Sequence, residues 1–417
     1  MRRVLVPGLL ACCAALVLAA TSCAPGGGKT PGGSAKGGAT ARNIVIWEQM
    51  DPEERARFEA NLEVFKQSHP GVTIQHTPYE TEQLRTQFQT AATAGGGPDL
   101  IFGPSDQVGP LSILNTIVPL DQTLEQGFFD RFVPGSLDTL NGHLYAAPDQ
   151  VGNHLVLCFD RRLVPRAPAT TAEFIATAKR LTRPGRYGFA MNTTEPYWLV
   201  PFLGGFGGWV MDAQARPTLD TPAMVQALAF LKSLRDQHKV MPRESDYMTA
   251  ETMFKEGKAA MIVNGPWSWS GYRKAGVDLG VAPIFRLPNG QWARPMVASK
   301  GYSINVNVPK DRLPLVVELL SFLTSPAAEL RSVRDLSILP SSRDAYRDST
   351  LLGDPTLAAS RQAIEKGGRM PVVPEMRVIW DVMRPEMQSV MNGVKTPAQA
   401  AKDMQRAAVT QIAGMKQ

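Results

Sequence analysis

The sequence predicts an α/β protein with two domains, each a mostly parallel sheet flanked by helices. Segments with the periods of strands and helices alternate along the chain, and this alternation favours parallel strands joined by helical crossovers. The length of 417 residues exceeds that of a usual single domain, and a hydrophobic content of 44% is enough for full-sized cores.

The first domain begins with a β-α-β-α-β pattern after residue 42. Apolar periodicity predicts strands at 43–47, 72–76 and 99–102, and helices at 52–68 and 80–94. The glycines at 95–97 precede a strand, whereas a phosphate-binding loop needs its glycines between a strand and a following helix. They therefore indicate a turn.

A second alternating set runs from about residue 155 to residue 285 and predicts the second domain. Its expected helices lie at 171–181, 222–237 and 250–256, and its expected strands lie at 187–191, 259–263 and 280–284. Three later helices, at 313–323, 357–366 and 396–413, complete the chain.

The N-terminal segment has the pattern of an export signal and a tether. Arg2 and Arg3 precede an apolar run over 4–20, which predicts a signal peptide at 1–22. The run ends in Ala-Thr-Ser-Cys at 20–23, which resembles a bacterial lipobox and predicts lipidation of Cys23. An ordinary signal peptide cut nearby is the alternative. Residues 23–42, rich in Gly, Ser, Lys and Pro, are expected to form a flexible tether at a membrane.

Composition and spacing exclude several function classes. The net charge of +6 is small for this length and its basic residues are scattered, so no nucleic acid partner is expected. The five histidines show no HxH or HExxH spacing, so neither a metal site nor a cofactor is expected. Cys158 lies in an apolar run and is predicted to be a buried small hydrophobe without a catalytic role.

The stretch NGPWSWSGY at 264–272 places two tryptophans directly after a predicted strand. Pro266 suits the first position of a helix, and helical residues two apart point about 200° away from each other. We therefore expect Trp269 to anchor the turn in the core and Trp267 to stand at the end of the strand, where α/β sheets place ligand crevices. The alternative is that both tryptophans are buried in the core.

The stretch EGKAAMIVNGPWSW at 256–269 closely resembles the bacterial maltose/maltodextrin-binding proteins, which are extracytoplasmic solute-binding proteins of ABC importers. Three more motifs resemble the same family in the same order: GPDLIF at 97–102, EPY at 195–197 and MPVVPEMRVIW at 370–380. The resemblance covers essentially the whole chain after Arg42.

The resemblance implies a two-lobed, periplasmic-binding-protein-like fold with a hinge that the chain crosses several times. Lobe one would combine 43–150 with 302–350, and lobe two would combine 153–297 with 355–417. The implied function is a monomeric, membrane-anchored lipoprotein that binds an α-glucan such as maltose or maltodextrin and delivers it to an ABC transporter permease without making or breaking a bond. The alternatives are a binding protein for trehalose or another disaccharide, an exported carbohydrate-active enzyme, and a lipoprotein that binds only a protein partner.

The resemblance also assigns candidate sugar-binding residues. In lobe two these are the stacking residues Trp267, Tyr197 and Trp380, the hydroxyl partners Glu195 and Arg384, and Met370 beside the sugar; in lobe one they are Asp51 and Asp106. Aromatic faces suit the C–H face of a pyranose, and charged hydrogen bonds to hydroxyls are strong and directional.

Each of these residues also has a purely structural interpretation. Asp51 and Asp106 could serve only as helix caps. Trp380 and Arg384 share a helical face, which equally permits packing, and Pro385 predicts that the helix bends or ends at Arg384. Trp198 and Trp209 are interpreted as packing residues.

The sequence departs from the family mainly in lobe one. Gly103 stands where the family has a sugar-facing tryptophan, Pro52 replaces a lysine, Gln107 replaces an arginine and Asp381 replaces a tyrosine. One residue is apparently inserted near Gly152 and Asn153, where the family has a glutamate. The sequence leaves open whether Tyr79, Tyr145 or another residue replaces the missing ring.

Overall fold

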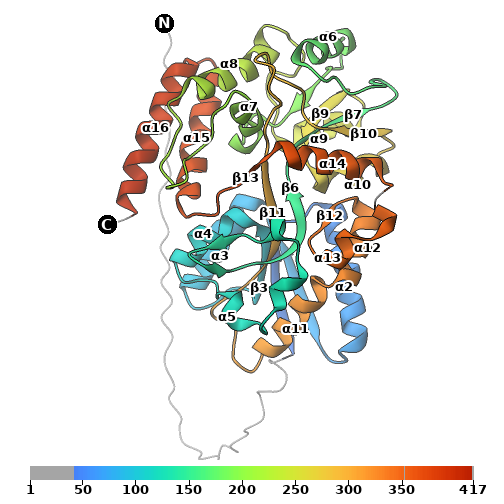
Figure 1. Ribbon diagram of the computed structural model, residues 1–417, viewed down its shortest axis with the longest axis vertical. Helices are drawn as coiled ribbons and strands as arrows, with labels where there is room; N and C mark the ends of the chain where they lie inside the picture. The colour runs from blue at the N-terminus through green and yellow to red at the C-terminus, as the bar shows by residue number, and fades with distance from the viewer. Residues whose placement is uncertain (1–41, 352, 416–417) are drawn as a thin grey trace, which may run out of the picture.

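The computed structural model describes residues 42–351 and 353–415, which form two lobes (Figure 1). The predicted signal peptide at 1–22, the lipidation site Cys23 and the tether up to residue 41 lie outside the described residues. One sheet and one main apolar cluster occupy each lobe, so the predicted two-lobed α/β fold is confirmed.

Lobe one, the lower half of Figure 1, is built on a seven-stranded sheet in the order β12-β6-β11-β3-β1-β2, with β13 paired to β11. The strands are β1 (Asn43–Glu48), β2 (Thr73–Pro78), β3 (Leu100–Pro104), β6 (Ala147–Asn153), β11 (Met296–Ile304), β12 (Leu339–Pro340) and β13 (Gly368–Arg369). A separate hairpin consists of β4 (Thr139–Leu140) and β5 (His143–Leu144).

Helices cover the sheet of lobe one because each has one apolar face. In α2, Phe58, Leu62 and Phe65 recur at helical spacing and pack against buried residues of the sheet. The helices are α2 (Pro52–Ser68), α3 (Thr81–Thr93), α4 (Val108–Ile113), α5 (Leu120–Thr123), α11 (Leu313–Leu323), α12 (Pro326–Leu336) and α13 (Arg343–Tyr346). Short 3₁₀ turns are η1 (Ser105–Gln107), η2 (Phe128–Arg131), η3 (Pro134–Ser136) and η6 (Ser349–Leu351).

Lobe two, the upper half of Figure 1, has a four-stranded sheet in the order β10-β7-β9-β8. Its strands are β7 (Val156–Asp160), β8 (Ala190–Met191), β9 (Met261–Asn264) and β10 (Leu279–Ala282). Its helices are α6 (Thr171–Leu181), α7 (Val200–Gly205), α8 (Pro222–Asp236), α9 (Tyr247–Lys255), α10 (Trp269–Lys274), α14 (Pro355–Lys366), α15 (Glu375–Met391) and α16 (Pro397–Gly414), with the 3₁₀ turns η4 (Pro196–Trp198) and η5 (Pro266–Ser268).

No single helix in the described part of the chain is long and apolar enough to cross a membrane. Only α11 and α12 together have that length and composition, and the two helices are bent by 48° relative to each other.

Both sheets are mixed, so the expectation of mostly parallel sheets is wrong. In lobe one, β1 is parallel to β2 and β3, but β11 is antiparallel to β3 and β6. In lobe two, β8 and β9 are parallel, whereas β7 is antiparallel to β9 and β10. The reason is the hinge: β6 carries the chain from lobe one to lobe two and β11 carries it back, so these neighbours must run in opposite directions.

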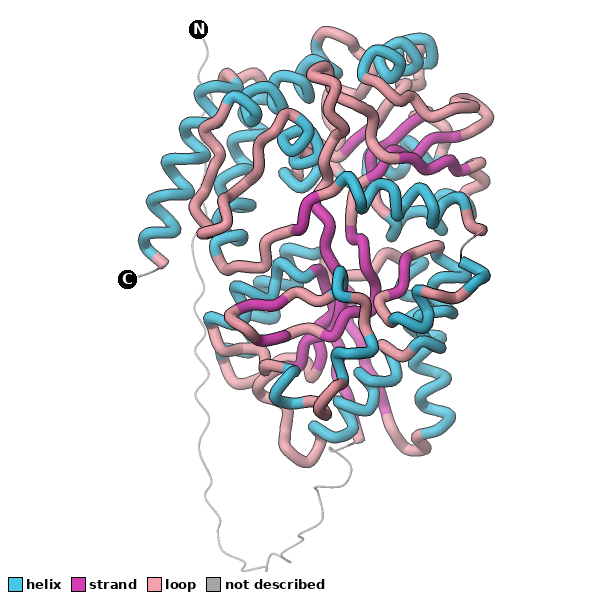
Figure 2. The backbone as a smooth tube through the Cα atoms, viewed as in Figure 1, coloured by secondary structure: helices cyan, strands magenta, loops and turns pink. Residues whose placement is uncertain are grey.

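The hinge consists of β6 and β11, which cross between the lobes at the centre of Figure 2. The chain crosses a third time between η6 and α14. The β6–β11 register skips Gly152, whose φ of 86° lies in the left-handed region that favours glycine. Such a bulge accommodates one extra residue, as the predicted insertion requires. We propose that the lobe boundaries follow the predicted ranges, since the crossings fall between them.

Most predicted elements have the expected positions, and three differ. The strand expected at 187–191 is reduced to β8, and α9 begins earlier than expected because the Asp246 side chain caps it by accepting from the Thr249 N–H. A bend or an end of the helix is expected at Arg384; the end is wrong, since α15 continues through Pro385, and the bend stays a prediction. Met387 and Val390 beyond the proline are buried in the core, and this packing outweighs the lost backbone hydrogen bond.

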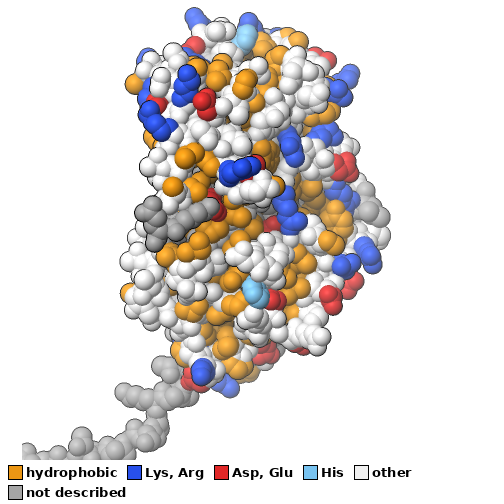
Figure 3. Space-filling view, turned by 60° about the vertical axis from the view of Figure 1, so that its left-hand side comes forward, with side chains coloured by type: hydrophobic (Ala, Val, Ile, Leu, Met, Phe, Trp, Pro, Cys, Tyr) orange, Lys and Arg blue, Asp and Glu red, His pale blue; other side chains and the backbone are white. Residues whose placement is uncertain are grey.

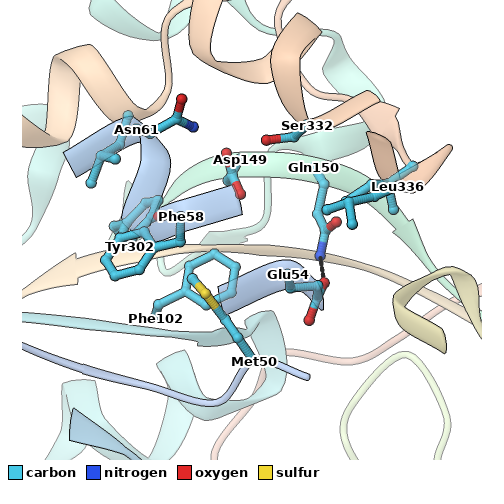
Figure 4. Close-up of a pocket in the computed structure, with 12 residues that line it drawn as sticks. Met50, Glu54, Phe58, Asn61, Phe102, Asp149, Gln150, Tyr302, Ser332 and Leu336 are labelled. Atoms are coloured by element: carbon cyan, nitrogen blue, oxygen red, sulfur yellow. Dashed lines mark hydrogen bonds between the residues drawn. The ribbon is translucent and has the colours of Figure 1, made fainter. Parts of the chain in front are cut away.

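A buried ion pair joins the start of α2 to the hinge. Lys300 Nζ on β11 donates to both oxygens of Glu54 at 3.0 and 2.9 Å, and the two side chains are only 3% and 6% exposed. Gln150 on β6 also donates to Glu54, at 3.4 Å (Figure 4). Beside it, Asp149 lines a cavity of about 20 Å³, and burial together with Glu329 and Glu54 raises the pKa of Asp149 well above its usual value.

Replacing Lys300 with methionine should destabilise the protein by about 3–5 kcal/mol, because Glu54 would then be a buried charge without its partner. The measurement is urea-induced unfolding at neutral pH, followed by circular dichroism.

The control for this prediction is Arg161→Met, because Arg161 pairs with Asp278 at 2.6 Å while both side chains are about half exposed. Loss of this surface pair should cost about 0–1 kcal/mol. Equal losses in the two variants would contradict the structural role given to Lys300.

Candidate functional site

A cleft of about 790 Å³ lies between the two lobes. This volume falls within the range of about 300–1,000 Å³ that is typical of sites for small molecules. Charged side chains gather at the waist of the molecule between the two halves (Figure 3). The cleft is therefore the candidate binding site of the described structure.

All eight predicted site residues line this cleft. From lobe one come Asp51 and Asp106, and from lobe two come Glu195, Tyr197, Trp267, Met370, Trp380 and Arg384. They lie on elements far apart in the sequence: the start of α2, η1, η4, η5 and α15, with Met370 following β13. The fold thus brings the candidates together, and their roles in binding are addressed under the proposed function.

The two tryptophans after β9 have different surroundings, as predicted. Trp269, at the start of α10, is fully buried with Cys158, Phe254 and Tyr272. Trp267, in η5, is half-buried, and its Nε1–H donates to the Tyr247 hydroxyl at 3.1 Å. Its ring lies directly over the backbone of residue 265, where a Cβ would collide with it, which explains the glycine at this position.

Cys158 is buried in the core of lobe two, as predicted. Burial raises the pKa of its thiol to about 12. The thiol is therefore protonated at neutral pH, and the side chain acts as a small apolar group.

Aromatic side chains form one wall of the cleft, on lobe two. Tyr197 meets Trp380 edge-on with ring centroids 6.3 Å apart, and Trp198 meets Trp267 in the same manner at 6.5 Å. The Tyr197 hydroxyl donates to the Asn153 carbonyl at 2.9 Å, and burial raises its pKa. Interlocked in this way, the rings form a preformed apolar surface.

Trp198 and Trp209 both pack as predicted. Trp198 is buried, and its Nε1–H donates to the Val263 carbonyl at 3.0 Å, but it also lines the cleft. Trp209 packs against the core with the Arg294 guanidinium 4.8 Å from its ring centroid.

Polar groups of the two lobes bond to one another across the cleft. The Tyr247 hydroxyl donates to Asp51 at 2.7 Å, and Trp380 Nε1 donates to Asp106 at 2.9 Å. Arg85 of lobe one also donates to Asp106, at 2.6 Å. These bonds connect both predicted lobe-one carboxylates to the opposite lobe.

The structural alternatives for the two aspartates have different outcomes. Asp51 stands at the N-cap position of α2 and also lines the cleft, so capping of the helix and a role in binding are compatible. Asp106 is not a cap, because it lies inside η1, whose N-cap is Pro104. Burial, with help from Glu251 and Glu54, raises the pKa of Asp51 to about 7.

A cluster of arginines and carboxylates lies at the rim of the cleft beside α15. Arg384 donates to both oxygens of Glu195, at 3.0 and 3.1 Å, so the two predicted hydroxyl partners pair with each other. Across the rim, Glu82 of α3 pairs with Arg377 and Arg384. Burial raises the pKa of Glu82, but Arg85, Arg377 and Arg384 outweigh it and lower the pKa overall.

The structure adds cleft residues that sequence reasoning missed. These are chiefly Glu82, Arg85, Asn192, Tyr247 and Lys300; Tyr79, which the sequence left open as a candidate ring, also lines the cleft. Tyr247 lies in none of the recognised motifs, and only folding brings its hydroxyl next to Asp51 and Trp267. The one available signal was Asp246 in front of a segment whose apolar residues recur at helical spacing, which marks a helix start but not a site.

The departures in lobe one change the wall opposite the aromatic rings. A Cβ at Gly103 would lie 2.7 Å from the Gln107 side chain, so glutamine occupies the space beside this glycine. Pro52 lines the cleft, whereas Asp381 is exposed and pairs with Arg377 at 3.0 Å.

Within residues 42–351 and 353–415, no three His, Cys, Asp or Glu side chains are grouped so that they could hold a metal ion.

The model of the bacterial extracellular solute-binding protein family matches residues 61–359. Among solved structures, the chain is similar to the maltose/maltodextrin-binding domain MalE from Bdellovibrio bacteriovorus bound to maltotriose. The identity is 39%, the TM-score is 0.87, and the match covers 89% of this chain and 99% of that chain.

Two further relatives come from other organisms. The chain is 26% identical over 361 residues to the maltotriose-binding protein of Pyrococcus abyssi, which covers 84% of this chain and 78% of that protein. It is 24% identical over 418 residues to the galactooligosaccharide-binding protein of Bacillus subtilis, which covers 96% of each. These matches confirm the resemblance that the motifs indicated. The chain belongs to the bacterial extracellular solute-binding protein family.

Proposed function

We propose that this protein is the extracytoplasmic sugar-binding component of an ABC importer and binds maltose- or maltodextrin-type oligosaccharides between its lobes. The observation that carries the proposal is the cleft itself, in which an aromatic wall on lobe two faces carboxylates on lobe one. The similarity to a MalE domain bound to maltotriose supports the same ligand class. In this proposal the protein is a monomer that hands unchanged sugar to the permease, and no bond is made or broken.

The proposed recognition divides between rings and charges. Trp267, Tyr197 and Trp380 stack on the C–H faces of pyranose units, and Met370 borders the sugar. The charged partners of the sugar hydroxyls are Glu195, Arg384, Asp51 and Asp106. Charged hydrogen bonds are directional, so these groups select the hydroxyl pattern.

Closure on the ligand follows from the bonds across the cleft. The Tyr247 hydroxyl donates to Asp51, and the Trp380 indole donates to Asp106. A sugar hydroxyl that binds to one of these aspartates takes the place of that donor. The ligand then contacts both lobes, so its affinity for the closed form exceeds its affinity for the open form. To change the ratio of closed to open protein from 1:99 to 99:1, the ligand must bind the closed form more favourably by about 5.5 kcal/mol.

An α-glucan is the first choice of ligand, and a disaccharide such as trehalose is the second. The first rests on the similarity to maltotriose-binding proteins. The second rests on lobe one, where Gln107 fills the space beside Gly103 and no ring stands at that position.

Trp267→Ala should weaken sugar binding by about thirtyfold or more, because truncating a central aromatic contact costs about 2 kcal/mol or more. Its unfolding midpoint should stay nearly unchanged, since the ring is only half-buried. The measurement is calorimetric titration with maltose, maltotriose, trehalose and sucrose, with chromatography to verify that each sugar is recovered intact.

The matched control is Trp269→Ala, two residues away. That ring is fully buried, so the change should cost about 3–5 kcal/mol of stability. A wild-type protein that binds none of these sugars would refute the proposed function, and turnover of a sugar would favour the enzyme alternative.

Addition of a tightly bound sugar should make the protein more compact, because the ligand draws the lobes together. Small-angle X-ray scattering of the free and saturated protein measures this as a smaller radius of gyration. Superimposable profiles would contradict closure.

We also propose that Cys23 is lipidated and anchors the protein outside the cell membrane, with residues 24–42 as the tether. The Cys23→Ser variant should move from the membrane fraction to the soluble fraction, because it lacks the thiol that carries the lipid. Immunoblotting of the separated fractions is the measurement. A variant that stays with the membrane would rule out this anchor.

A further inference from the structure

We propose that Tyr79 is the stacking residue of lobe one, with its phenol ring against a pyranose unit of the ligand. This inference rests on the proposed function, and it names a contact for which the sequence offered only candidates. Among the described residues that line the cleft, lobe two contributes five aromatic side chains, and Tyr79 is the aromatic side chain from lobe one.

The position of Tyr79 suits a ligand contact. It directly follows β2, which is parallel to β1, and α/β sheets place their ligands at the carboxyl ends of such strands. Its backbone N–H donates to the Glu48 carbonyl at 2.9 Å, and α3 begins two residues later. The ring is therefore held on a short, fixed connection rather than on a long loop.

The ring has a firm support and an available polar end. Trp47 lies behind it, with ring centroids 5.1 Å apart and an angle of 55° between the planes. The Tyr79 hydroxyl makes no hydrogen bond to any described residue, whereas the hydroxyls of Tyr197 and Tyr247 are both bonded. The ring packs against Trp47 and the side chain remains half-buried, which leaves surface for a sugar.

Other aromatic residues of lobe one do not reach the cleft. Trp47 and Tyr145 pack in the same apolar cluster as Tyr79, but neither lines the cleft. Phe102 lines the small cavity beside Glu54 instead. Tyr79 therefore supplies from the β2–α3 connection the ring that Gly103 cannot supply from β3.

The experiment titrates maltotriose into wild type, Tyr79→Phe, Tyr79→Leu and Tyr145→Leu. An aromatic contact contributes about 0.5–1.5 kcal/mol beyond its area, so Tyr79→Leu should weaken binding by about 2- to 12-fold. Tyr79→Phe keeps the ring and should bind more tightly than Tyr79→Leu. Tyr145→Leu, which alters a neighbouring ring outside the cleft, should bind as wild type does.

Thermal midpoints accompany each titration, and Tyr79→Met provides a second variant without a ring if Tyr79→Leu does not fold. Wild-type affinity in a folded variant without the ring would overturn the inference. Equal losses of affinity in Tyr79→Phe and Tyr79→Leu would also overturn it, because the contact would then involve only the hydroxyl. These results would leave the proposed function intact if Trp267→Ala still lost binding. Absence of any sugar binding by wild type would refute the proposed function first.

Discussion

The buried pair between Glu54 and Lys300 is the interaction on which the arrangement of the cleft depends. It joins the first turn of α2 to β11, and Gln150 of β6 donates to the same carboxylate. The Glu54 carboxylate therefore links α2 to both hinge strands. The Asp51 N–H also donates to Glu54, at 3.3 Å. Asp51 is thereby held at the lobe boundary, where its carboxylate meets Tyr247. Burial of two charges is costly, and this pair is tolerated because further hydrogen bonds complete it.

The two walls of the cleft differ in chemistry. Lobe two presents interlocked rings whose positions are set by its own core, as in the buried Trp198 and the α15 residue Trp380. Lobe one presents Asp51 and Asp106, which accept hydrogen bonds from the opposite lobe, and Arg85, which donates to Asp106 within lobe one. The rings therefore lie mainly on lobe two, which also carries the Glu195–Arg384 pair, so lobe two can hold a sugar while lobe one completes the closed form. Tyr79 would be the exception on lobe one.

Much of the fold could be predicted from periodicity, because helices such as α6, α11 and α16 carry strong local signals. Strand direction could not, because it depends on how β6 and β11 carry the chain between lobes. The continuation of α15 through Pro385 was also missed, since burial of Met387 against the core overrides the local preference. Both of these errors arose where contacts between distant parts of the chain decided the outcome.

By itself, the sequence determined the two-lobed class, the family, and eight of the residues that line the cleft, because motifs and their order are local features of the chain. It also separated Trp267 from Trp269, since their spacing forces the rings in different directions. Only the tertiary structure decided which groups face each other across the cleft: Asp51 with Tyr247, and Asp106 with Trp380. Residues that distant in sequence meet only because the hinge folds one lobe against the other.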